Sequence, residues 1–493
     1  MSDVMKIIRD PKMTYRQRLF SMAKAAENSI APIQLSEKAQ RFADCGIISD
    51  MNEGNLPYRP RYVVPDYEKY LKQGSKFLLI NPPTDIWEAV SNLLILYHHV
   101  PSVTGLPVYI GHLDRLLEPF IIDENEARKA IRMLLTHVDR TVSDSFCHCD
   151  IGPYDTCAGR IILELVEEMQ RPVPNMSIIY NEETSEAFAL KAISTGLVTS
   201  RPSFVNDQMY RAEWGENYAI VSCYNALPIG GGGLTLGRLN MKNLADAAAS
   251  REHLVNELLP DAVKAQCEWM DKRDNYIIDE CNFFMNSFLI EEGLIYPERF
   301  VGMFGLVGLA ECVNKVLNLT SKHERYGHSE EANAFGEQLL NQINELVQAY
   351  IPKYGKFCMH GQVGIASDKG VTPNTRIPVG EEPDFLTHLR VTARMHKCFT
   401  CGIGDIFPFE VTAKQNPQAV LDIIKGAFAE NMRYFSFYSN DSDVIRISGY
   451  LVKRSEIEKY NNGKAVFETN TSLGSDAINN LHVLERKIRS INM

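Results

Sequence analysis

The chain has 493 residues, of which 45% are hydrophobic and 23% charged, and a formal net charge of −11 at pH 7. The composition is that of a globular protein with a large core, and the acidic balance argues against a nucleic-acid-binding protein and suits an enzyme for small molecules. The longest apolar stretch, residues 300–313, is too short to span a bilayer, and no apolar run follows a basic start, so we expect neither a membrane span nor a secretory signal. The eleven cysteines then indicate free thiols in a reducing cytoplasm.

The first 65 residues are predicted to form a helical arm and a connector. Tyr15 to Asn28 carries apolar residues at helical spacing, and residues 53–65 contain one glycine and three prolines, which is typical of extended chain. Further along, Asp85 to His99 is predicted as an amphipathic helix that begins at a capping residue. Leu106 to Phe120 is predicted as the end of a strand followed by a capped helix.

Polar side chains adjoin two predicted strands in the next part of the chain. The run Cys147–Asp150 (Cys-His-Cys-Asp) is a potential ligand cluster, because residues i and i+2 of a strand point to the same side. Two free thiols at a strand end are the alternative. A predicted helix over residues 160–170 leads into Pro-Val-Pro-Asn-Met-Ser-Ile at 172–178. Asn175 there precedes a predicted buried strand, where turn residues are favoured.

Residues 217–240 hold a candidate centre. Cys223 lies in an apolar segment, and four consecutive glycines, residues 230–233, follow it. By itself Cys223 is either a small buried hydrophobic residue or a one-electron relay. The glycines could offer backbone N–H groups to an anionic substrate, or form a flexible loop. Arg238 could bind a carboxylate or phosphate of that substrate.

Cysteine and histidine residues gather again before residue 402. Cys398 and Cys401 form a C-x-x-C pair, and Cys358, His360 and His396 are the further candidates for a zinc site of four ligands. The alternative is a set of ordinary thiols. Both interpretations stay open here, and no bound metal enters the functional hypothesis.

The C-terminal segment contains the pattern on which the functional hypothesis depends. Pro417 to Asn431 is predicted as a helix with one apolar face, and Tyr434 to Tyr438 as a strand. The nine residues Val444–Val452 read Val-Ile-Arg-Ile-Ser-Gly-Tyr-Leu-Val. Strand-forming residues lie on both sides of Gly449, so the segment is predicted as two short strands that meet at this glycine.

Val444–Val452 resembles the signature of the glycyl radical enzymes, in which an Arg, a β-branched residue and a small residue precede Gly-Tyr. A radical on a backbone Cα is stabilised when the centre is planar between a nitrogen and a carbonyl, and glycine has no side chain to clash on planarisation. The resemblance implies that Gly449 is the modified residue that stores the radical. It also implies a separate radical-SAM activating enzyme as the partner that abstracts its hydrogen.

Residues 217–240 are similar to the cysteine loop of pyruvate formate-lyase, which implies that Cys223 carries a thiyl radical. Pyruvate formate-lyase has two adjacent cysteines, and Ser222 replaces the first of them. Related diol dehydratases and C–C lyases carry Cys-x-Glu, and Asn225 stands at the position of that Glu. The chain therefore lacks the attacking thiol of one reaction and the base of the other.

Segments 106–120 and 172–178 also resemble pyruvate formate-lyase-like barrels, with His112 where that family usually has Arg. The whole chain most resembles the YjjI-type glycine radical family. The resemblance implies an α/β fold with a ten-stranded barrel of two five-stranded parallel halves, surrounded by helices, in which the Cys and Gly loops meet at the centre. The expected domains are an arm over 1–65, the barrel over 66–430 and the radical segment over 431–493.

The implied mechanism starts from the Gly449 radical, which takes hydrogen from Cys223. The thiyl then abstracts hydrogen from a small polar substrate, for which Arg238, Asn225 and Ser222 are the predicted binding residues. The resemblance implies radical lyase, transferase or rearrangement chemistry under anaerobic conditions, with oxygen sensitivity, a cytoplasmic location and a homodimer. No bound cofactor, nucleic acid or membrane is expected.

Three alternatives are weaker. An anaerobic class III ribonucleotide reductase is suggested by residues 299–313, which resemble a strand-to-helix element of those enzymes, but the chain is short, shows no ATP-cone domain and has only one of two C-x-x-C pairs. A catalytically inactive barrel that serves as scaffold or regulator would not need the retained Gly449 signature and Cys223. A small spare-part protein that replaces damaged radical domains would lack the barrel segments.

Overall fold

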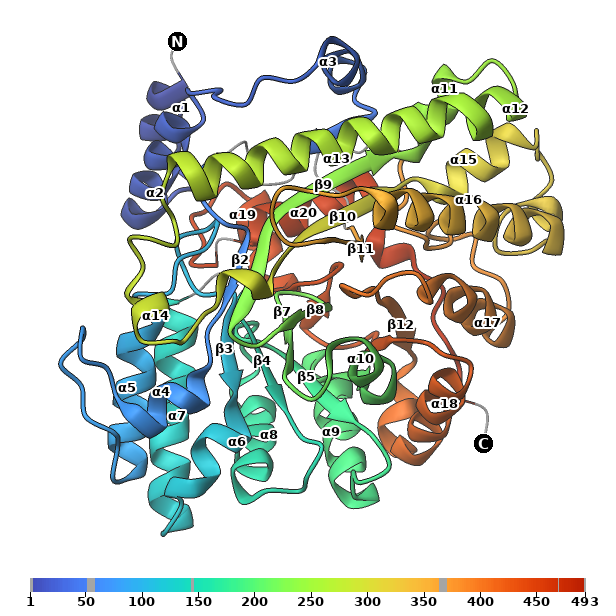
Figure 1. Cartoon of the computed structure of the whole chain (residues 1–493). Coiled ribbons are helices and arrows are strands. Elements are labelled where there is room, and N and C mark those ends of the chain that lie inside the picture. The colour runs from blue at the N-terminus through green and yellow to red at the C-terminus, as the bar shows by residue number, and fades with distance from the viewer. Residues whose placement is uncertain (1–2, 51–57, 143–145, 363–369, 469, 492–493) are drawn as a thin grey trace.

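A computed structural model describes residues 3–50, 58–142, 146–362, 370–468 and 470–491; the start of the predicted connector, residues 53–57, lies outside these ranges. The protein is an α/β structure with two sheets at its centre and helices around them (Figure 1). The expected α/β class is therefore confirmed.

The larger sheet has six strands in the order β12-β13-β6-β5-β4-β3. Their bounds are β3 (Tyr109–His112), β4 (His148–Ile151), β5 (Asn175–Tyr180), β6 (Ser203–Asn206), β12 (Asp405–Phe409) and β13 (Tyr434–Ser439). Strands β3 to β6 are parallel, and so are β12 and β13. The two groups meet antiparallel, where Tyr434 pairs with Val205. Nearly every residue of these strands is buried, as expected for parallel strands covered on both faces.

The smaller sheet is built around β9 (Gly231–Asn240). On one side β1 (Ile48–Asp50) and β2 (Tyr62–Val64) pair with it antiparallel, so part of the predicted N-terminal arm belongs to this sheet. On the other side β10 (Phe300–Val307) pairs parallel with β9, and β11 (Phe357–Gly361) pairs parallel with β10.

Gly231 to Gly233 form the start of β9, so the flexible loop, one of the two alternatives for the glycine run, is wrong for these three residues. Gly231 to Gly233 pair with β2, and Gly232 and Gly233 also pair with β10. A side chain at Gly232 would overlap the carbonyl of Tyr62 and the ring of Phe300. Glycine is needed here because two neighbouring strands approach closely, and the backbone groups serve the sheet.

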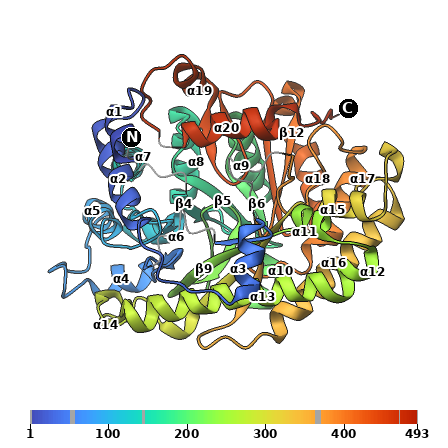
Figure 2. The same ribbon diagram turned by 90° about the horizontal axis from the view of Figure 1, so that it is seen from above.

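Helices surround both sheets. Their bounds are α1 (Asp3–Arg9), α2 (Tyr15–Glu27), α3 (Glu37–Asp44), α4 (Tyr67–Gln73), α5 (Ile86–Tyr97), α6 (Leu113–Leu117), α7 (Glu124–Thr141), α8 (Cys157–Met169), α9 (Glu186–Thr199), α10 (Asp207–Trp214), α11 (Met241–Ala247), α12 (Arg251–His253), α13 (Leu259–Asn275), α14 (Phe288–Glu291), α15 (Leu309–Val316), α16 (Glu330–Ala349), α17 (Phe385–His396), α18 (Pro417–Ala429), α19 (Arg454–Asn461) and α20 (Thr471–Leu481). Helix α13 packs along β9, α16 along β11 and α9 along β13. Seen from above, α13 lies on one side of the molecule and α19 and α20 on the opposite side (Figure 2).

Strand hydrogen bonds within the described ranges do not close the predicted ten-stranded barrel. They give sheets of five and six strands, so the finer prediction holds only in part. Between β11 and the segment before β12, single backbone hydrogen bonds replace a ladder. Gly361 N–H donates to the Gly402 carbonyl over 2.8 Å, and Cys401 N–H donates to the Met359 carbonyl over 2.9 Å.

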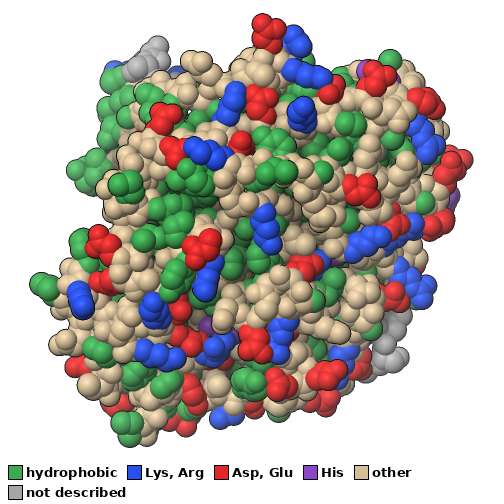
Figure 3. Space-filling model, in the orientation of Figure 1, with side chains coloured by type: hydrophobic (Ala, Val, Ile, Leu, Met, Phe, Trp, Pro, Cys, Tyr) green, Lys and Arg blue, Asp and Glu red, His purple; other side chains and the backbone are tan. Residues whose placement is uncertain are grey.

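Across the described ranges, every helix is too short or too polar to cross a membrane. Lys, Arg, Asp and Glu side chains are interspersed with apolar ones on the face shown in Figure 3. The mixture of both signs of charge on this face matches the composition of the chain.

Candidate functional site

The Gly loop is a hairpin near the C-terminus. Strands β14 (Val444–Arg446) and β15 (Leu451–Lys453) pair antiparallel, and Ile447 N–H donates to the Tyr450 carbonyl over 3.1 Å. Gly449 therefore lies at the tip, and its N–H donates to Ser448 Oγ over 2.6 Å. The Arg486 guanidinium donates to the backbone carbonyls of Arg446 and Ile447, which fixes the base of the tip from the C-terminal side.

The Cys loop is a second hairpin. Strands β7 (Tyr218–Val221) and β8 (Asn225–Pro228) pair antiparallel up to Val221 and Asn225, which leaves Ser222, Cys223 and Tyr224 at the tip. Ser222 has a φ of +60°, the left-handed conformation that a tight turn needs. Asn225 Nδ2 donates to the Val221 carbonyl over 3.1 Å and braces the turn.

The carboxyl ends of the parallel strands hold β7 in place. Asp150, in β4, accepts from Ile220 N–H over 2.9 Å, and Asp207, just after β6, accepts from the Tyr218 hydroxyl over 2.7 Å. Both carboxylates are buried. The Cys loop is thereby attached to a rigid edge of the larger sheet, as required of a precisely placed reactive group.

The tips of the two hairpins touch, as the sequence hypothesis expects. A Cβ on Gly449 would come closer than 3.0 Å to Cβ and Sγ of Cys223 and within 3.2 Å of its Cα. Because a Cα–Cβ bond is about 1.5 Å long, Sγ of Cys223 lies within about 4.5 Å of the Gly449 Cα. Cys223 is 5% exposed, so this contact is shielded from solvent.

Buried polar residues surround the contact. Burial raises the pKa of the Cys223 thiol above its ordinary value, although the Ser222 hydroxyl and the positive charges of Arg61, Arg446 and Arg376 act in the opposite direction. The thiol consequently keeps its proton at neutral pH. A protonated thiol suits hydrogen-atom transfer, whereas nucleophilic attack requires the thiolate.

A chain of hydrogen bonds from the larger sheet orients the Cys loop. Nδ1 of His148 lies 2.8 Å from the Ser222 carbonyl, and its Nε2 lies 2.8 Å from Ser177 Oγ. Ser177 Oγ lies 2.9 Å from the Tyr434 hydroxyl. A carbonyl only accepts, so His148 is the Nδ1–H tautomer and Nε2 accepts from Ser177. Burial lowers the pKa of His148 to about 3, which keeps the ring neutral.

The other predicted site residues have different surroundings. Arg238 is buried in β9, with its backbone paired to Gly305 of β10 and Ser49 of β1. Its role in substrate binding, like those of Ser222 and Asn225, stays a prediction. His148 was a predicted ligand candidate and instead supports the Cys loop. Ser177, Tyr434 and Arg486 have no local signal in the sequence that reveals their positions, because their partners are remote.

The candidate zinc ligands do not converge on one point. Cys358 and Cys401 are hydrogen-bonded to each other, whereas the Cys398 thiol contacts Asn341 Oδ1 at 3.4 Å. His360 bonds to Gln362, and His396 Nδ1 accepts from Arg433 N–H. In the part of the chain that the structure describes, no group of three or more His, Cys, Asp or Glu side chains could hold a metal ion. The zinc hypothesis is therefore not supported.

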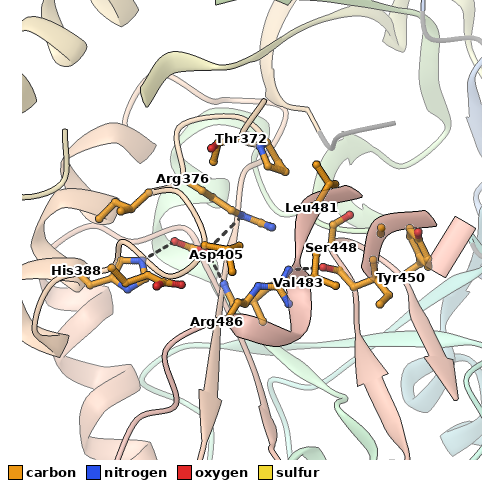
Figure 4. A pocket seen from close by; sticks show the side chains of 16 residues that line it. Thr372, Arg376, His388, Asp405, Ser448, Tyr450, Leu481, Val483 and Arg486 are labelled. Carbon is orange, nitrogen blue, oxygen red and sulfur yellow. Dashed lines mark hydrogen bonds and ion pairs between the residues drawn. The ribbon is translucent and has the colours of Figure 1, made fainter. Parts of the chain in front are cut away.

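A small cavity of about 40 Å³ lies behind the Gly loop (Figure 4). Ser448 and Tyr450, the neighbours of Gly449, line it, together with charged residues that include Arg376, Asp405 and Arg486. This volume is enough for two or three water molecules. The Gly loop thus contacts the Cys loop and also lines a small cavity that contains charged side chains.

A second buried polar cluster lies where β3 leads into α6. Asp114 accepts from Gly152 N–H over 2.8 Å, and Nε2 of the neighbouring His112 lies 2.5 Å from the Gly152 carbonyl. Burial raises the pKa of Asp114 to about 7 and lowers that of His112 to about 3. The carboxyl is therefore half protonated near neutral pH, and His112 is neutral there.

Asp114→Asn should remove a pH dependence of stability. Between pH 3.8 and 7 the unfolded carboxyl ionises while the folded one keeps its proton, so wild-type stability falls as pH rises. Over this range the wild type should lose about 3–4 kcal/mol relative to Asp114→Asn. Urea denaturation of both proteins at pH 4, 5, 6 and 7 measures the difference. A constant difference would contradict the raised pKa.

The fold is similar to that of solved glycyl radical enzymes. The chain superposes on a glycyl radical enzyme from Archaeoglobus fulgidus with a TM-score of 0.72 at 11% sequence identity, covering 98% of this chain and 86% of that one. The "Glycyl radical enzyme YjjI-like" family model matches residues 13–489.

Two relatives are similar over nearly the full length. An uncharacterized protein of Haemophilus influenzae is 42% identical, with 99% of this chain and 98% of that one covered. The uncharacterized protein YjjI of Escherichia coli K12 is 40% identical, with 99% and 95% covered. The chain belongs to the YjjI-like family of glycyl radical enzymes, which confirms the resemblance identified from the Gly449 segment.

Proposed function

We propose that the protein is a radical enzyme in which Gly449 stores a radical and Cys223 transfers it to a small polar substrate. The observation that carries the proposal is the contact between the tips of the two hairpins. It joins the residue type best suited to hold a backbone radical with a protonated, buried thiol.

The proposed reaction conserves atoms and electrons at each step. The Gly449 Cα radical takes the hydrogen atom of the Cys223 S–H bond, which leaves an intact glycine and a thiyl radical. The thiyl takes a hydrogen atom from a C–H bond of the substrate, and the substrate radical rearranges or fragments. The product radical then recovers hydrogen from Cys223, and the thiyl regains hydrogen from Gly449. Burial excludes bulk water from these intermediates.

The residues next to Cys223 restrict the reaction class. Ser222 provides no second thiol for acyl transfer, and Asn225 provides no carboxylate base for dehydration of a diol. The proposed chemistry is therefore lyase, transferase or rearrangement chemistry that needs neither group. Arg238, Ser222 and Asn225 are the proposed contacts of the substrate, and a radical-SAM activating enzyme is the proposed partner, with a homodimer as the working assembly.

Electron paramagnetic resonance in H2O and D2O tests the proposal. After anaerobic activation with the activating enzyme, S-adenosylmethionine and reductant, wild type should show a doublet from the single α-hydrogen of the Gly449 radical. In D2O the Cys223 thiol carries deuterium, so reversible transfer should replace that hydrogen and collapse the doublet to a singlet. Cys223→Ser should keep the doublet in D2O, because a hydroxyl O–H bond is too strong to exchange hydrogen with the radical.

Cys312→Ser is the matched control. Cys312 is a fully buried thiol in α15 that belongs to a different core cluster from Cys223, so its removal should leave the collapse in D2O unchanged. A doublet that collapses equally in Cys223→Ser would refute Cys223 as the relay. Absence of any signal with several activating enzymes, each active on its own substrate, would favour an inactive scaffold.

The second candidate function is that of a class III ribonucleotide reductase. The candidate zinc ligands do not converge on one point, which argues against a ribonucleotide reductase. Equilibrium dialysis with ribonucleoside triphosphates distinguishes the candidates, since a reductase binds its nucleotide substrate and the proposed enzyme does not.

A further inference from the structure

The side chain of Asn175 contacts both hairpins that carry the proposed radical residues. Its Nδ2 donates to the Gly449 carbonyl over 2.9 Å and to the Ser222 carbonyl over 3.3 Å. Its Oδ1 accepts from Arg446 Nη2 over 3.0 Å. One carboxamide therefore joins the tip of the Gly loop, the tip of the Cys loop and the arginine of the glycine signature.

Asn175 is itself held rigidly. It is the first residue of β5, it is 2% exposed, and its N–H donates to the Cys147 carbonyl over 2.9 Å. Its Oδ1 also accepts from Met176 N–H over 2.9 Å, so both ends of the carboxamide are engaged. The side chain has no freedom to follow one loop without leaving the other.

The two carbonyls that share this nitrogen need a donor between them. Both oxygens carry partial negative charge and lie in a buried site, where such charges interact strongly. If Nδ2 were removed, the Ser222 carbonyl would keep the hydrogen bond from His148 Nδ1, but the Gly449 carbonyl would lose this donor and the one side chain that joins the two carbonyls would be gone. The tips would then move apart, and hydrogen transfer depends steeply on that separation.

We propose that Asn175 is a positioning residue that sets the separation between the Gly449 Cα and Cys223 Sγ. This inference rests on the proposed function for its consequence, the rate of hydrogen transfer. The anchoring of both loops by one side chain is a property of the resting protein and is measurable without any radical. The Pro-Val-Pro-Asn segment thus ends at the first residue of β5, and the side chain of this residue joins two loops that are remote from it in sequence.

Asn175→Asp is the sharpest test. Aspartate has the same shape and keeps an oxygen for Arg446, but it lacks both N–H groups and places negative charge against the two carbonyls. The matched control is Asn206→Asp. Asn206 is a buried residue of the adjacent strand β6 whose Nδ2 also donates to two carbonyls, those of Met432 (3.0 Å) and Phe428 (3.3 Å), away from both hairpins.

Two measurements are made on wild type, Asn175→Asp and Asn206→Asp. The first is amide hydrogen–deuterium exchange, read by mass spectrometry on peptides that cover residues 218–228 and 444–453. Asn175→Asp should raise exchange in both peptides, and Asn206→Asp in neither. The second is the radical signal per chain and the rate at which the doublet collapses in D2O. Asn175→Asp should keep the signal per chain and slow the collapse about tenfold to hundredfold.

The outcomes separate the two hypotheses. Unchanged amide exchange in Asn175→Asp would overturn the anchoring, and collapse at the wild-type rate would overturn the positioning role. If wild type itself shows no collapse that depends on Cys223, the proposed function fails, while amide exchange still decides the anchoring. If Asn175→Asp does not fold, Asn175→Ser replaces it, since its short hydroxyl cannot reach both carbonyls and adds no charge.

Discussion

Gly449→Ala should abolish the radical signal completely and push the two hairpins apart. A Cβ at this position would overlap Cβ and Sγ of Cys223. The atoms in the way belong to a short side chain on a buried turn, so they cannot move aside without moving the Cys loop. An alanyl radical would also need a planar Cα with a methyl group attached, which the same contact forbids. Activated wild type and variant are compared by anaerobic electron paramagnetic resonance.

Gly426→Ala is the control for this experiment. Gly426 lies within α18, and a Cβ there meets nothing within 4 Å. Alanine in a helix is favoured over glycine by about 0.5–1 kcal/mol, so this variant should be at least as stable as wild type and give the full signal. Air exposure offers an independent readout. Activated wild type and Gly426→Ala should break into two fragments at residue 449, and Gly449→Ala should stay whole. A full doublet from Gly449→Ala would place the radical elsewhere.

Local patterns predict much of the fold because the relevant interactions are local. The predicted helices at 15–28, 85–99 and 417–431 correspond to α2, α5 and α18 within a few residues. Their caps explain this accuracy: the side chains of Thr14, Asp85 and Asn416 each accept a hydrogen bond from the first turn. Of these three caps, only that of the helix at 85–99 was predicted from the sequence, as an Asp or a Thr.

The glycine run shows where local patterns fail. Residues 230–233 carry no apolar alternation, which favours a loop, yet β2 and β10 flank Gly232 and Gly233 and impose a strand. The information that decides their conformation lies in two segments remote from them. The barrel prediction came from a resemblance, and a resemblance does not specify how individual strands pair where the two sheets meet.

The candidate site likewise contains residues that local sequence patterns predict and residues that they do not. Gly449 and Cys223 could be predicted as site residues from the sequence because each lies within a recognisable segment. Asn175 was identified only as a turn residue, because its partner carbonyls are on Ser222 and Gly449, and a backbone carbonyl has no residue type to recognise. Residues that act through backbone atoms of remote segments leave little trace in one sequence, so only the structure reveals them.

Asp405→Asn should be the most destabilising single substitution in the cluster behind the Gly loop. Asp405 is buried at the start of β12, 3.3 Å from Arg376 Nε and 3.0 Å from His388 Nε2. Nδ1 of His388 lies 2.6 Å from Arg489 Nη2. An arginine only donates, so His388 Nδ1 accepts from Arg489, and His388 Nε2–H donates to Asp405. The carboxylate therefore places a buried negative charge 3.3 Å from Arg376 Nε.

Loss of that charge leaves a buried guanidinium uncompensated, which costs about 3–5 kcal/mol. The pH dependence of stability tests whether the lost charge of Asp405 is the cause of this destabilisation. Burial would raise the pKa of Asp405, but the hydrogen bond from His388 and the charge of Arg376 outweigh it and hold the pKa well below its ordinary value of 3.8. The stabilisation is consequently present above pH 3.8 and is lost as pH falls toward the folded pKa. Urea denaturation at pH 7, 5 and 3 should show the deficit of Asp405→Asn shrinking at the lowest pH.

The exposed pair Asp261–Lys38 supplies the control, because Asp261→Asn should cost no more than about 1 kcal/mol at any pH. Equal effects of the two substitutions would contradict a buried charge cluster. The effect should extend to the Gly loop, because Arg376 and Arg486 line the same cavity as Ser448 and Tyr450. Arg486 also donates to the carbonyls of Arg446 and Ile447. We therefore expect Asp405→Asn to raise amide exchange across residues 444–453 while Asp261→Asn leaves it unchanged.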